Sequence, residues 1–405
     1  MSVTLSRQPY AKKVRFKVAI AVSHPIQHFA PQFRSWSRRP DVDLLVLYAS
    51  SAGAVEHYDP GFAAPVRWDQ SVLAGYPFEL LDGHREEPAP LSAMLDAPSI
   101  TRHLSVFDPD IVVTYGYAHR FAHRVRRWGI GHRKHLAYVS DSENRHREGA
   151  RRSLLKRLAV RRYLKPFSSV WTVGDANEEY YLDLGLSTQV LHRMRFPIDV
   201  DLFTRTWRSK EQVRSNYRRR LGLADDEVAV LVVGKLIARK RHIDALQACL
   251  RIGSEMKVRL IVVGSGPEES SLMTAAKQFE HRGPIFAGFV DPNDLPGFYA
   301  ASDVYLHPSN HDPHPLAVSE AIFMGLPVLV SDRTGSWGDS DDVIPGHNGF
   351  VFQCGDVDSL KSRIVALAES PNRRRTFAMN SRALGVAYQR HSHHTFLDHF
   401  LLQFS

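Results

Sequence analysis

The sequence predicts an α/β protein of two domains, each a parallel sheet with helices wound around it. Short apolar runs alternate with helical stretches through both halves of the chain, an order typical of βαβ units. The clearest unit spans residues 304–332: an apolar run, a loop, a helix from Pro315 to about Met324, and a second apolar run. The chain has 405 residues, which is ample for two domains.

Each predicted strand is a short apolar run rich in β-branched residues. In the first half these runs lie at residues 17–22, 43–48, 111–114, 136–139 and 169–173. A helical segment separates the first two runs, which predicts a right-handed βαβ unit. In the second half the runs lie at residues 228–233, 259–263, 285–290, 304–306 and 328–330.

Composition restricts the classes of partner. The chain has 52 Lys and Arg against 43 Asp and Glu, a net charge of +9 that favours nucleic acid, an anionic membrane surface or small phosphorylated substrates. Two cysteines, Cys249 and Cys354, argue against a disulfide scaffold or a thiolate metal site and fit a reducing cytoplasm. The apolar runs are too short to indicate an export signal or a transmembrane helix.

Two acids are predicted to share a cleft at the carboxyl end of the strand at 304–306. Asp312 lies in the loop after this strand, and the helix would carry Glu320 back under that loop. In open α/β sheets ligands bind outside the carboxyl ends of strands, where helix N-termini offer N–H groups to phosphate. Glu320 stands in an otherwise apolar helix, so its charge requires a polar partner there.

This block resembles the signature of family 4 glycosyltransferases, which have the GT-B architecture of two Rossmann-like domains facing a cleft. The family pattern is Glu, seven residues, Glu; this chain has Asp312, seven residues and Glu320, followed by AIFMGLPVLVSD, which matches the usual continuation. Many members have Gly where this chain has Pro315. Proline has no N–H, so Leu316 and Ala317 would supply the backbone donors to a diphosphate at this helix start.

The resemblance covers both halves, and its specific part is residues 228–355. It implies an acceptor domain at 1–200, a nucleotide-sugar-binding domain at 201–385, and a helix at 386–405 that crosses back to the first domain. The segment at 196–199, Phe-Pro-Ile-Asp, resembles the Pro-Gly-Val-Asp segment that joins the two domains in the family.

The loop after the strand at 228–233 is predicted to hold the donor diphosphate. Lys235 and Lys240 stand where family members have Arg and Lys. Lysine keeps the charge but lacks the bidentate fork of arginine. Arg239 and Arg241 are close by, so the first position of this clamp belongs either to Lys235 or to a neighbouring arginine.

Further donor contacts are implied by the resemblance. The GSG turn that contains Gly264 would approach the ligand closely, although it lacks the third glycine of a dinucleotide fingerprint. The backbone near Phe289 and Val290 would contact the base, and Glu320 would bind the ribose. Glu320, as part of the family signature, is a candidate both for donor binding and for catalysis.

Three residues complete the implied catalytic set with Glu320. Asp312 would contact sugar hydroxyls and stabilise positive charge at the anomeric carbon. Lys240 would offset the charge that develops on the leaving diphosphate. His119 falls where the family places a histidine that faces the donor sugar.

Polar residues after two first-domain strands are candidates for acceptor binding. His24 and His28 follow the strand at 17–22, and Asp141 and Glu143 follow the strand at 136–139. A histidine is more often a satisfied surface residue than a catalyst, and the acids could equally cap a helix. The sequence leaves both interpretations of each pair open.

A basic run extends from Arg145 to Lys165, with nine Lys or Arg against one Glu. Leu154, Leu155 and Leu158 gather on one side of the corresponding helix, but arginines point the same way. A membrane-surface helix would separate its charges from its apolar residues. The run is therefore either a contact with an anionic membrane or an ordinary solvated helix.

The resulting hypothesis is a retaining glycosyltransferase that moves a hexose-type sugar from a nucleotide diphosphate sugar to a glycan or lipid-linked acceptor in bacterial polysaccharide biosynthesis. It would need no metal or other cofactor, because lysines do the work of a metal at the diphosphate. The triplet at 339–341 is formally a DxD metal motif, but the same pattern recurs at 108, 199 and 356.

The expected location is the cytoplasm, with attachment to the inner face of the cytoplasmic membrane left open. Two alternatives remain. A sugar-nucleotide epimerase of the same fold would convert the donor without an acceptor. A basic nucleic-acid-binding protein would fit the net charge, but the sequence has no recognisable reading helix or aromatic-interleaved basic motif, so no nucleic acid is expected as a partner.

Overall fold

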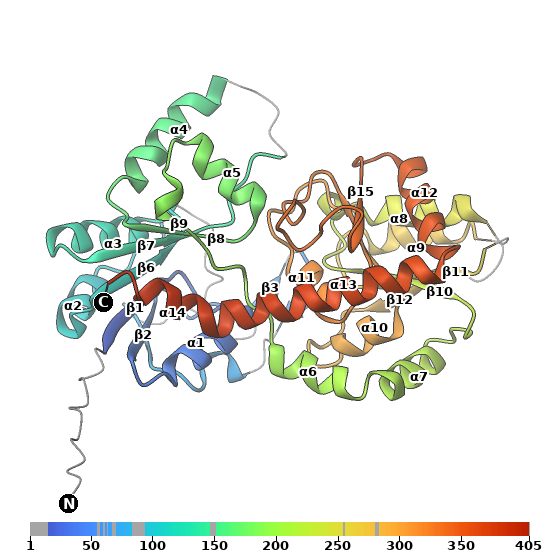
Figure 1. Cartoon of the computed structure of the whole chain (residues 1–405), viewed down its shortest axis with the longest axis horizontal. Coiled ribbons are helices and arrows are strands. Elements are labelled where there is room, and N and C mark those ends of the chain that lie inside the picture. Colours follow the sequence, from blue (N-terminus) through green and yellow to red (C-terminus); the bar gives the residue numbers. More distant parts are fainter. Residues whose placement is uncertain are drawn as a thin grey trace, which may run out of the picture.

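The computed structural model describes residues 15–54, 57–59, 61–62, 64–66, 70–82, 94–145, 151–253, 256–279 and 283–404. It contains two parallel α/β sheets, one in each half of the chain (Figure 1). The N-terminal residues 1–14 and part of the basic run, residues 146–150, lie outside the described residues. The predicted fold class, two Rossmann-like α/β domains, is confirmed.

The first sheet has seven parallel strands in the order β5-β2-β1-β6-β7-β8-β9. Its strands are β1 (Phe16–Val22), β2 (Val42–Tyr48), β5 (Phe78–Leu80), β6 (Ile111–Tyr115), β7 (His135–Val139), β8 (Ser169–Thr172) and β9 (Leu191–Arg193). Both faces of β1 are buried, because Val18 and Ile20 enter one core cluster while Ala19 and Ala21 enter the other. Burial on both faces explains why these strands are continuous apolar runs rather than alternating ones.

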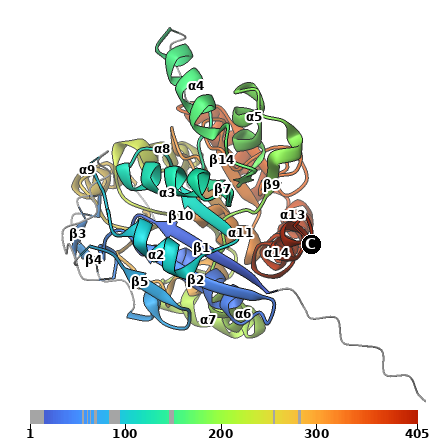
Figure 2. The ribbon, with the colours of Figure 1, turned by 90° about the vertical axis from the view of Figure 1, so that its left-hand side faces the viewer.

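The helices of the first half are α1 (Ala30–Ser37), α2 (Ile100–Phe107), α3 (Arg120–Gly131), α4 (Arg151–Leu164) and α5 (Asp175–Asp183). A separate antiparallel ribbon is formed by β3 (His57–Asp59) and β4 (Ala64–Val66). Short helical turns lie at Gln27–Phe29, Gln70–Leu73 and Thr188–Val190. Helix α4 projects from the body of the molecule and has α5 beside it (Figure 2).

The second sheet has six parallel strands in the order β12-β11-β10-β13-β14-β15. They are β10 (Val228–Val233), β11 (Val258–Val263), β12 (Ile285–Gly288), β13 (Val304–His307), β14 (Val328–Ser331) and β15 (Gly349–Phe352). Val230 and Val232 of β10 enter one core cluster, whereas Ala229 and Leu231 enter the cluster on the other face. Both faces of this sheet are therefore covered as well.

The helices of the second half are α6 (Val200–Arg208), α7 (Lys210–Arg220), α8 (His242–Ile252), α9 (Glu269–Ala276), α10 (Leu295–Ala301), α11 (Leu316–Phe323), α12 (Val357–Ala368), α13 (Pro371–Arg390) and α14 (Phe396–Leu401), with a short turn at Ala238–Lys240. A π-helical turn, His391–Thr395, joins α13 to α14. The aromatic rings of Phe396 and Phe400 pack on Trp171 of the first domain. The chain thus returns to the first domain at its C-terminal end (Figure 1).

Both sheets have a point at which the strand order reverses. In the first sheet it lies between β1 and β6, and in the second between β10 and β13. Ligands of open α/β sheets bind in the crevice outside the carboxyl ends of the strands at such a point. The loops after β10 and β13 carry Lys235, Lys240 and Asp312, and Glu320 lies on α11, which follows the second loop; these residues are thus at the switch point of the second sheet.

Candidate active site

A chain of polar contacts runs through the switch point of the second sheet. Lys240, in the turn after β10, forms an ion pair with the carboxylate of Asp312. His307, the last residue of β13, contacts the same carboxylate oxygen through Nε2 at 2.8 Å. The hydroxyl of Tyr305 lies 3.2 Å from Nδ1 of His307. Because the carboxylate can only accept, Nε2 of His307 donates to Asp312 and its Nδ1 accepts from Tyr305.

These contacts fix the ionisation of Asp312. Burial alone would raise the pKa of its carboxyl group, but the hydrogen bond from His307 and the positive charge of Lys240 outweigh burial and hold the pKa well below its usual range. Burial also lowers the pKa of His307, which therefore acts as a neutral donor. Asp312 is accordingly an anion at neutral pH, held by donors from β13 and from the turn after β10.

Glu320 has a different environment, one turn inside helix α11. Its Oε2 accepts a hydrogen bond of 2.7 Å from the hydroxyl of Tyr299 on α10. Burial raises the pKa of Glu320 to about 7, and the hydrogen bond from Tyr299 only partly opposes this effect. Tyr305 lies near both acids, since the charges of Glu320 and Asp312 both raise its pKa. The polar partner that the sequence required for Glu320 is thus a buried tyrosine.

Lys235, the other predicted lysine of the diphosphate clamp, contacts the first domain. Its ammonium lies 2.7 Å from a carboxylate oxygen of Asp59, at the end of β3. Of the two neighbouring arginines, Arg241 is paired with Asp244 of α8 at 2.6 Å. The backbone carbonyl of Arg239 accepts from Asn310 in the loop before Asp312. Lys235 thus pairs with the other domain and Arg241 within its own, and the residue at the first position of the clamp remains a prediction.

The glycine turn after β11 lies against the turn after β10. Gly264 has a backbone φ of +139°, and a Cβ there would overlap the carbonyl oxygen of Gly234. Only glycine fits this position, which brings the two turns together beside Lys235. The predicted role of Gly264 as a place of close backbone approach is compatible with this geometry.

The remaining donor candidates line the same edge of the sheet. Phe289 follows β12 and is 43% exposed, while Val290 packs against the core. Leu316 and Ala317 are the first residues of α11, after Pro315 in extended conformation. The first N–H groups of an α-helix have no acceptor within the helix, so these two can face an anion.

The acceptor candidates of the first domain lie opposite the loop that carries Asp312. Nδ1 of His24 lies 2.9 Å from the hydroxyl of Ser23. Burial, together with the charges of His314 and His24, lowers the pKa of His28 to about 3, so this ring is neutral. The ring of His314 in turn stands edge-on to Phe196, in the segment that joins the domains. His28 of the first domain and His314 of the second therefore lie close enough to interact.

Asp141 and Glu143 also face the second domain. Burial raises the pKa of Asp141, and the charges of His314 and Asp312 both act on it. Glu143 is buried, accepts the backbone N–H of Arg145, and has Oε1 at 3.5 Å from Nδ1 of His311. Besides the contact of Glu143 with the backbone of Arg145, both acids interact with the loop that holds Asp312.

His119 lies beyond the carboxyl end of β6, at the same edge of the first sheet as the acceptor candidates. It precedes the first turn of α3 and is partly exposed. Its proximity to a donor sugar remains a prediction.

Several residues of this region were not singled out from the sequence. His307 and Tyr305 could have been found, because alternation along β13 puts both on the face that carries Glu320 and Tyr299. Arg145, the first residue of the basic run, donates to the carbonyls of Thr334 at 2.9 Å and Trp337 at 2.7 Å. Arg145 is thus an interdomain contact, which sequence spacing could not reveal.

A buried group of His314, Asp341 and Asp342 has ligand atoms within 4.8 Å of one another. Nη1 of Arg195 lies 3.8 Å from Asp341 and 3.5 Å from Asp342, so a cation already faces both carboxylates. Asp341 also accepts the backbone N–H of Asp175 at 2.6 Å, across the domain boundary. The acid of the formal DxD triplet therefore has a structural role between the domains.

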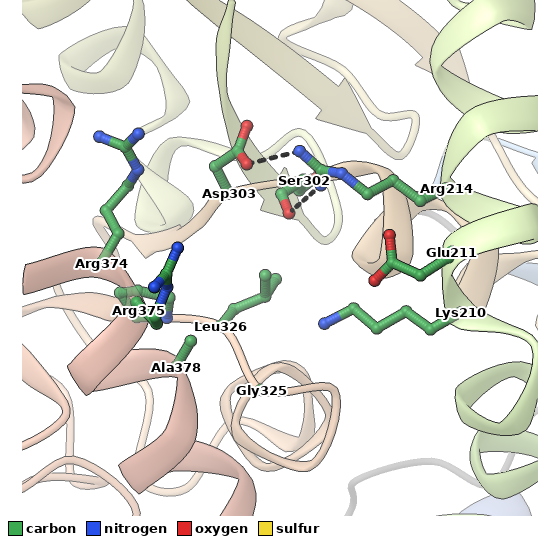
Figure 3. Close-up of a pocket in the computed structure, with 11 residues that line it drawn as sticks. Lys210, Glu211, Arg214, Ser302, Asp303, Gly325, Leu326, Arg374, Arg375 and Ala378 are labelled. Atoms are coloured by element: carbon green, nitrogen blue, oxygen red, sulfur yellow. Dashed lines mark hydrogen bonds and ion pairs between the residues drawn. The ribbon is translucent and has the colours of Figure 1, made fainter. Parts of the chain in front are cut away.

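A hollow of about 210 Å³ lies elsewhere, at the amino ends of β13 and β14 (Figure 3). Lys210 and Glu211 from α7 line one side, and Arg374 and Arg375 from α13 line the other. The ammonium of Lys210 donates to the carbonyl of Met324 at 2.9 Å, at the C-terminal end of α11, where a positive charge stabilises the helix. This hollow is at the opposite edge of the sheet from Asp312.

Helix α4 presents three leucines to the surface. Leu154, Leu155 and Leu158 are 62%, 78% and 54% exposed. Among the described residues, none of the helices combines the length and the apolar character needed to span a bilayer. The three exposed leucines lie on a helix that is rich in arginine and lysine.

Comparison with known proteins finds a matching family for part of the second half of the chain. Residues 213–384 match the family described as glycosyl transferases group 1. A GDP-mannose-dependent alpha-mannosyltransferase of Mycobacterium tuberculosis is 28% identical over 198 residues, 49% of this chain and 48% of that protein. An uncharacterized glycosyltransferase of Methanocaldococcus jannaschii is 33% identical over 121 residues, 30% of this chain and 31% of that protein. The aligned regions thus span about a third to a half of these relatives.

Solved structures match along nearly the whole chain. HepE of Anabaena, in complex with UDP and glucose, superposes with a TM-score of 0.67 at 18% identity, covering 95% of this chain and 100% of that one. Sucrose-phosphate synthase of Thermosynechococcus elongatus gives a TM-score of 0.69 at 17% identity, covering 96% and 99%. The chain therefore has the GT-B fold, and residues 213–384 of its second domain match the glycosyl transferases group 1 model.

Proposed function

We propose that this protein is a retaining glycosyltransferase, which moves a hexose-type sugar from a nucleoside diphosphate sugar to a glycan or lipid-linked acceptor. The observation that carries the proposal is the ion pair of Lys240 with Asp312 at the switch point of the second sheet, with Glu320 on the helix that follows. The family match covers both of these elements. Capsular polysaccharide and teichuronic acid glycosyltransferases among the relatives support a role in bacterial surface polysaccharide biosynthesis.

The donor diphosphate would bind between the turn after β10 and the start of α11. Lys235 and Lys240 would offset the negative charge that grows on the leaving diphosphate, and the N–H groups of Leu316 and Ala317 would bind its oxygens. The lysines supply the charge that a metal ion supplies in other transferases, so the reaction is proposed to need no metal. The carboxylate of Glu320 would accept hydrogen bonds from the hydroxyl groups of the ribose.

Asp312 would act on the transferred sugar. Its carboxylate stays ionised because Lys240 and His307 stabilise the charge, so it can stabilise positive charge at the anomeric carbon and accept from sugar hydroxyls. The acceptor would enter from the first domain, along His24, His28, Asp141 and Glu143. His119 would face the donor sugar from the same side.

A transfer assay with a panel of UDP, GDP and ADP sugars tests this proposal. We expect release of nucleoside diphosphate with one donor, an acceptor-dependent product that retains the donor's anomeric configuration by NMR, and full activity after treatment with EDTA. Loss of activity with EDTA, restored by a divalent cation, would refute metal independence. Conversion of the donor without any acceptor would instead assign the protein as an epimerase.

We further propose that helix α4 attaches the enzyme to an anionic membrane, where a lipid-linked acceptor would lie. The exposed Leu154, Leu155 and Leu158 sit among basic residues, and this combination binds anionic bilayers through apolar burial and charge. Binding of this kind would place the enzyme on the inner face of the cytoplasmic membrane.

Flotation with liposomes of phosphatidylcholine and phosphatidylglycerol tests the membrane proposal. The wild-type protein should float in a salt-sensitive manner, and a triple change of these leucines to serine should abolish flotation. Met379→Ser is the matched control, because Met379 is 63% exposed on α13, away from α4. Equal flotation of the triple variant and the control would exclude α4 as the attachment site.

A further inference from the structure

Three residues of the first domain, Asp59, Gly61 and Phe62, lie against the proposed donor site of the second domain; we call them the strap residues. The carboxylate of Asp59 lies 2.7 Å from the ammonium of Lys235. The same ammonium stands 4.8 Å from the centre of the Phe62 ring. A cation between a carboxylate and an aromatic face is stabilised by both groups. The first domain thus supplies both close partners of Lys235.

Further contacts hold the strap residues in place. The hydroxyl of Ser265, in the glycine turn after β11, donates to the carbonyl of Phe62 at 2.9 Å. The Phe62 ring packs edge-on against Phe289, with centroids 5.3 Å apart and planes at 87°. A Cβ at Gly61 would stand 2.6 Å from Cδ of Lys235, closer than side chains pack. The strap residues therefore touch three segments that the family resemblance assigns to the donor: the turn after β10, the glycine turn after β11 and Phe289.

Asp59 is an anion in this contact. Burial alone would raise the pKa of its carboxyl group, but the hydrogen bond from Lys235 and the N–H of Gly61, at 2.7 Å, hold the pKa below its usual value. Ammonium groups bind carboxylate and phosphate oxygens in the same way, as point charges with N–H donors. A donor diphosphate and Asp59 would therefore compete for one partner.

We propose that Asp59 holds a phosphate subsite of the donor pocket, and that a nucleoside diphosphate binds Lys235 by displacing this carboxylate. The proposal rests on the proposed function, which assigns Lys235 to the diphosphate. Donor binding then loosens the contact between the strap residues and the second domain. After transfer, the return of Asp59 to Lys235 favours release of the nucleoside diphosphate.

Titration calorimetry of UDP, GDP and ADP with wild-type protein and Asp59→Asn tests this inference. Asparagine has the same shape but no charge, so the variant should bind the recognised diphosphate about fivefold more tightly, the effect expected for one half-exposed ion pair. Uridine and guanosine lack phosphates and should bind both proteins equally. Asp59→Glu, which keeps the charge, should bind the diphosphate like the wild type.

Asp226→Asn is the matched control, because Asp226 pairs with Lys257 in a more exposed contact outside the candidate site. Unchanged or weaker diphosphate binding by Asp59→Asn would overturn the inference and leave the proposed function standing. An equal gain in affinity for the nucleoside and for the diphosphate would also overturn the inference, because the substitution would then not act through the phosphates. Failure of the wild type to bind UDP, GDP or ADP would overturn both.

Discussion

Asp312 and Glu320 belong to one strand–loop–helix unit, yet their surroundings shift their proton affinities in opposite directions. In the loop, His307 and Lys240 both donate to the Asp312 carboxylate and lower its pKa. Inside α11, the hydrogen bond from the Tyr299 hydroxyl to Glu320 only partly opposes burial, and the pKa of Glu320 rises to about 7. Burial raises the pKa of both acids, so the difference between them comes from the number of donors and the presence of a nearby cation.

This difference suits two different tasks. A carboxylate that faces a developing positive charge has to be ionised throughout the reaction, and Asp312 meets this condition. An acid that binds hydroxyl groups can exchange its proton near neutral pH, and Glu320 is in that position. Substitution of Lys240, Glu320 or Tyr299 separates the two tasks. The expected effects decrease in that order.

Lys240→Ala should have the largest effect, a loss of kcat/KM of about 10³-fold, because it removes the cation from both the leaving diphosphate and Asp312. Lys257→Ala is the matched control, since Lys257 also pairs with an aspartate but at an exposed site. Steady-state transfer assays on folded protein, verified by circular dichroism, measure the difference. Turnover close to that of the control would contradict the role given to Lys240.

Glu320→Ala should lower kcat/KM by about 10²-fold, mostly through a higher KM for the donor, because contacts with the ribose stabilise ground state and transition state alike. Glu320→Gln keeps a hydrogen-bonding group of the same size and should lose less. If the alanine variant lost kcat alone and kept its donor KM, Glu320 would act on the reacting sugar instead of on the ribose.

The pH dependence of donor affinity distinguishes the two acids. Affinity of the wild type should rise about tenfold as the pH increases through about 7, because Glu320 loses its proton there while Asp312 is ionised throughout. Glu320→Gln should abolish this dependence. A wild-type profile that is flat between pH 6 and 8 would show that Glu320 does not titrate in this range.

The same shift predicts a trend in stability. The pKa of Glu320 is raised from its ordinary value of 4.5 to about 7, so between these pH values the folded protein binds more protons than the unfolded chain. The free energy of unfolding should therefore fall as the pH rises through this window, by about 2 to 3 kcal/mol from this group. In urea unfolding, the free energy of unfolding of the wild type should fall relative to that of Glu320→Gln as the pH rises through this window. A difference between the two proteins that does not change with pH would contradict this prediction.

Tyr299→Phe should have the smallest effect. The change removes the hydrogen bond to Glu320 and keeps the buried ring, so the pKa of Glu320 should rise further and donor affinity at pH 7 should fall about threefold. The affinity profile should shift to higher pH without a change in its upper limit. A lower limit at high pH would mean that Tyr299 also contacts the donor.

The unit at 304–332 was predictable because each of its parts follows from local chemistry. The strand is apolar, Pro315 precedes the helix, and Gly325 with a φ of +66° ends it. Each predicted strand is present to within a residue or two, as at β13, which includes His307, whereas β3, β4, β5, β9 and β15 were not predicted. The doubly wound order of both sheets likewise follows from alternating strands and helices.

Contacts between the domains could not be predicted, because they join residues far apart in the sequence. Asp59 and Lys235 are separated by 176 positions, and Arg145 lies 189 positions before Thr334. Nothing in the local pattern around Asp59 indicates a partner in the other domain. The basic run shows the same limit: its first residue bridges the domains, whereas the leucines of α4 face outward.

The central claim is that the turn with Lys240 and the start of α11 bind a nucleoside diphosphate, and calorimetry with UDP and GDP tests it most directly. Wild-type protein should bind one of the two at a single site, Lys257→Ala should bind it equally well, and Lys240→Ala should lose at least about tenfold in affinity. Equal binding of that diphosphate by the wild type and Lys240→Ala would contradict the account.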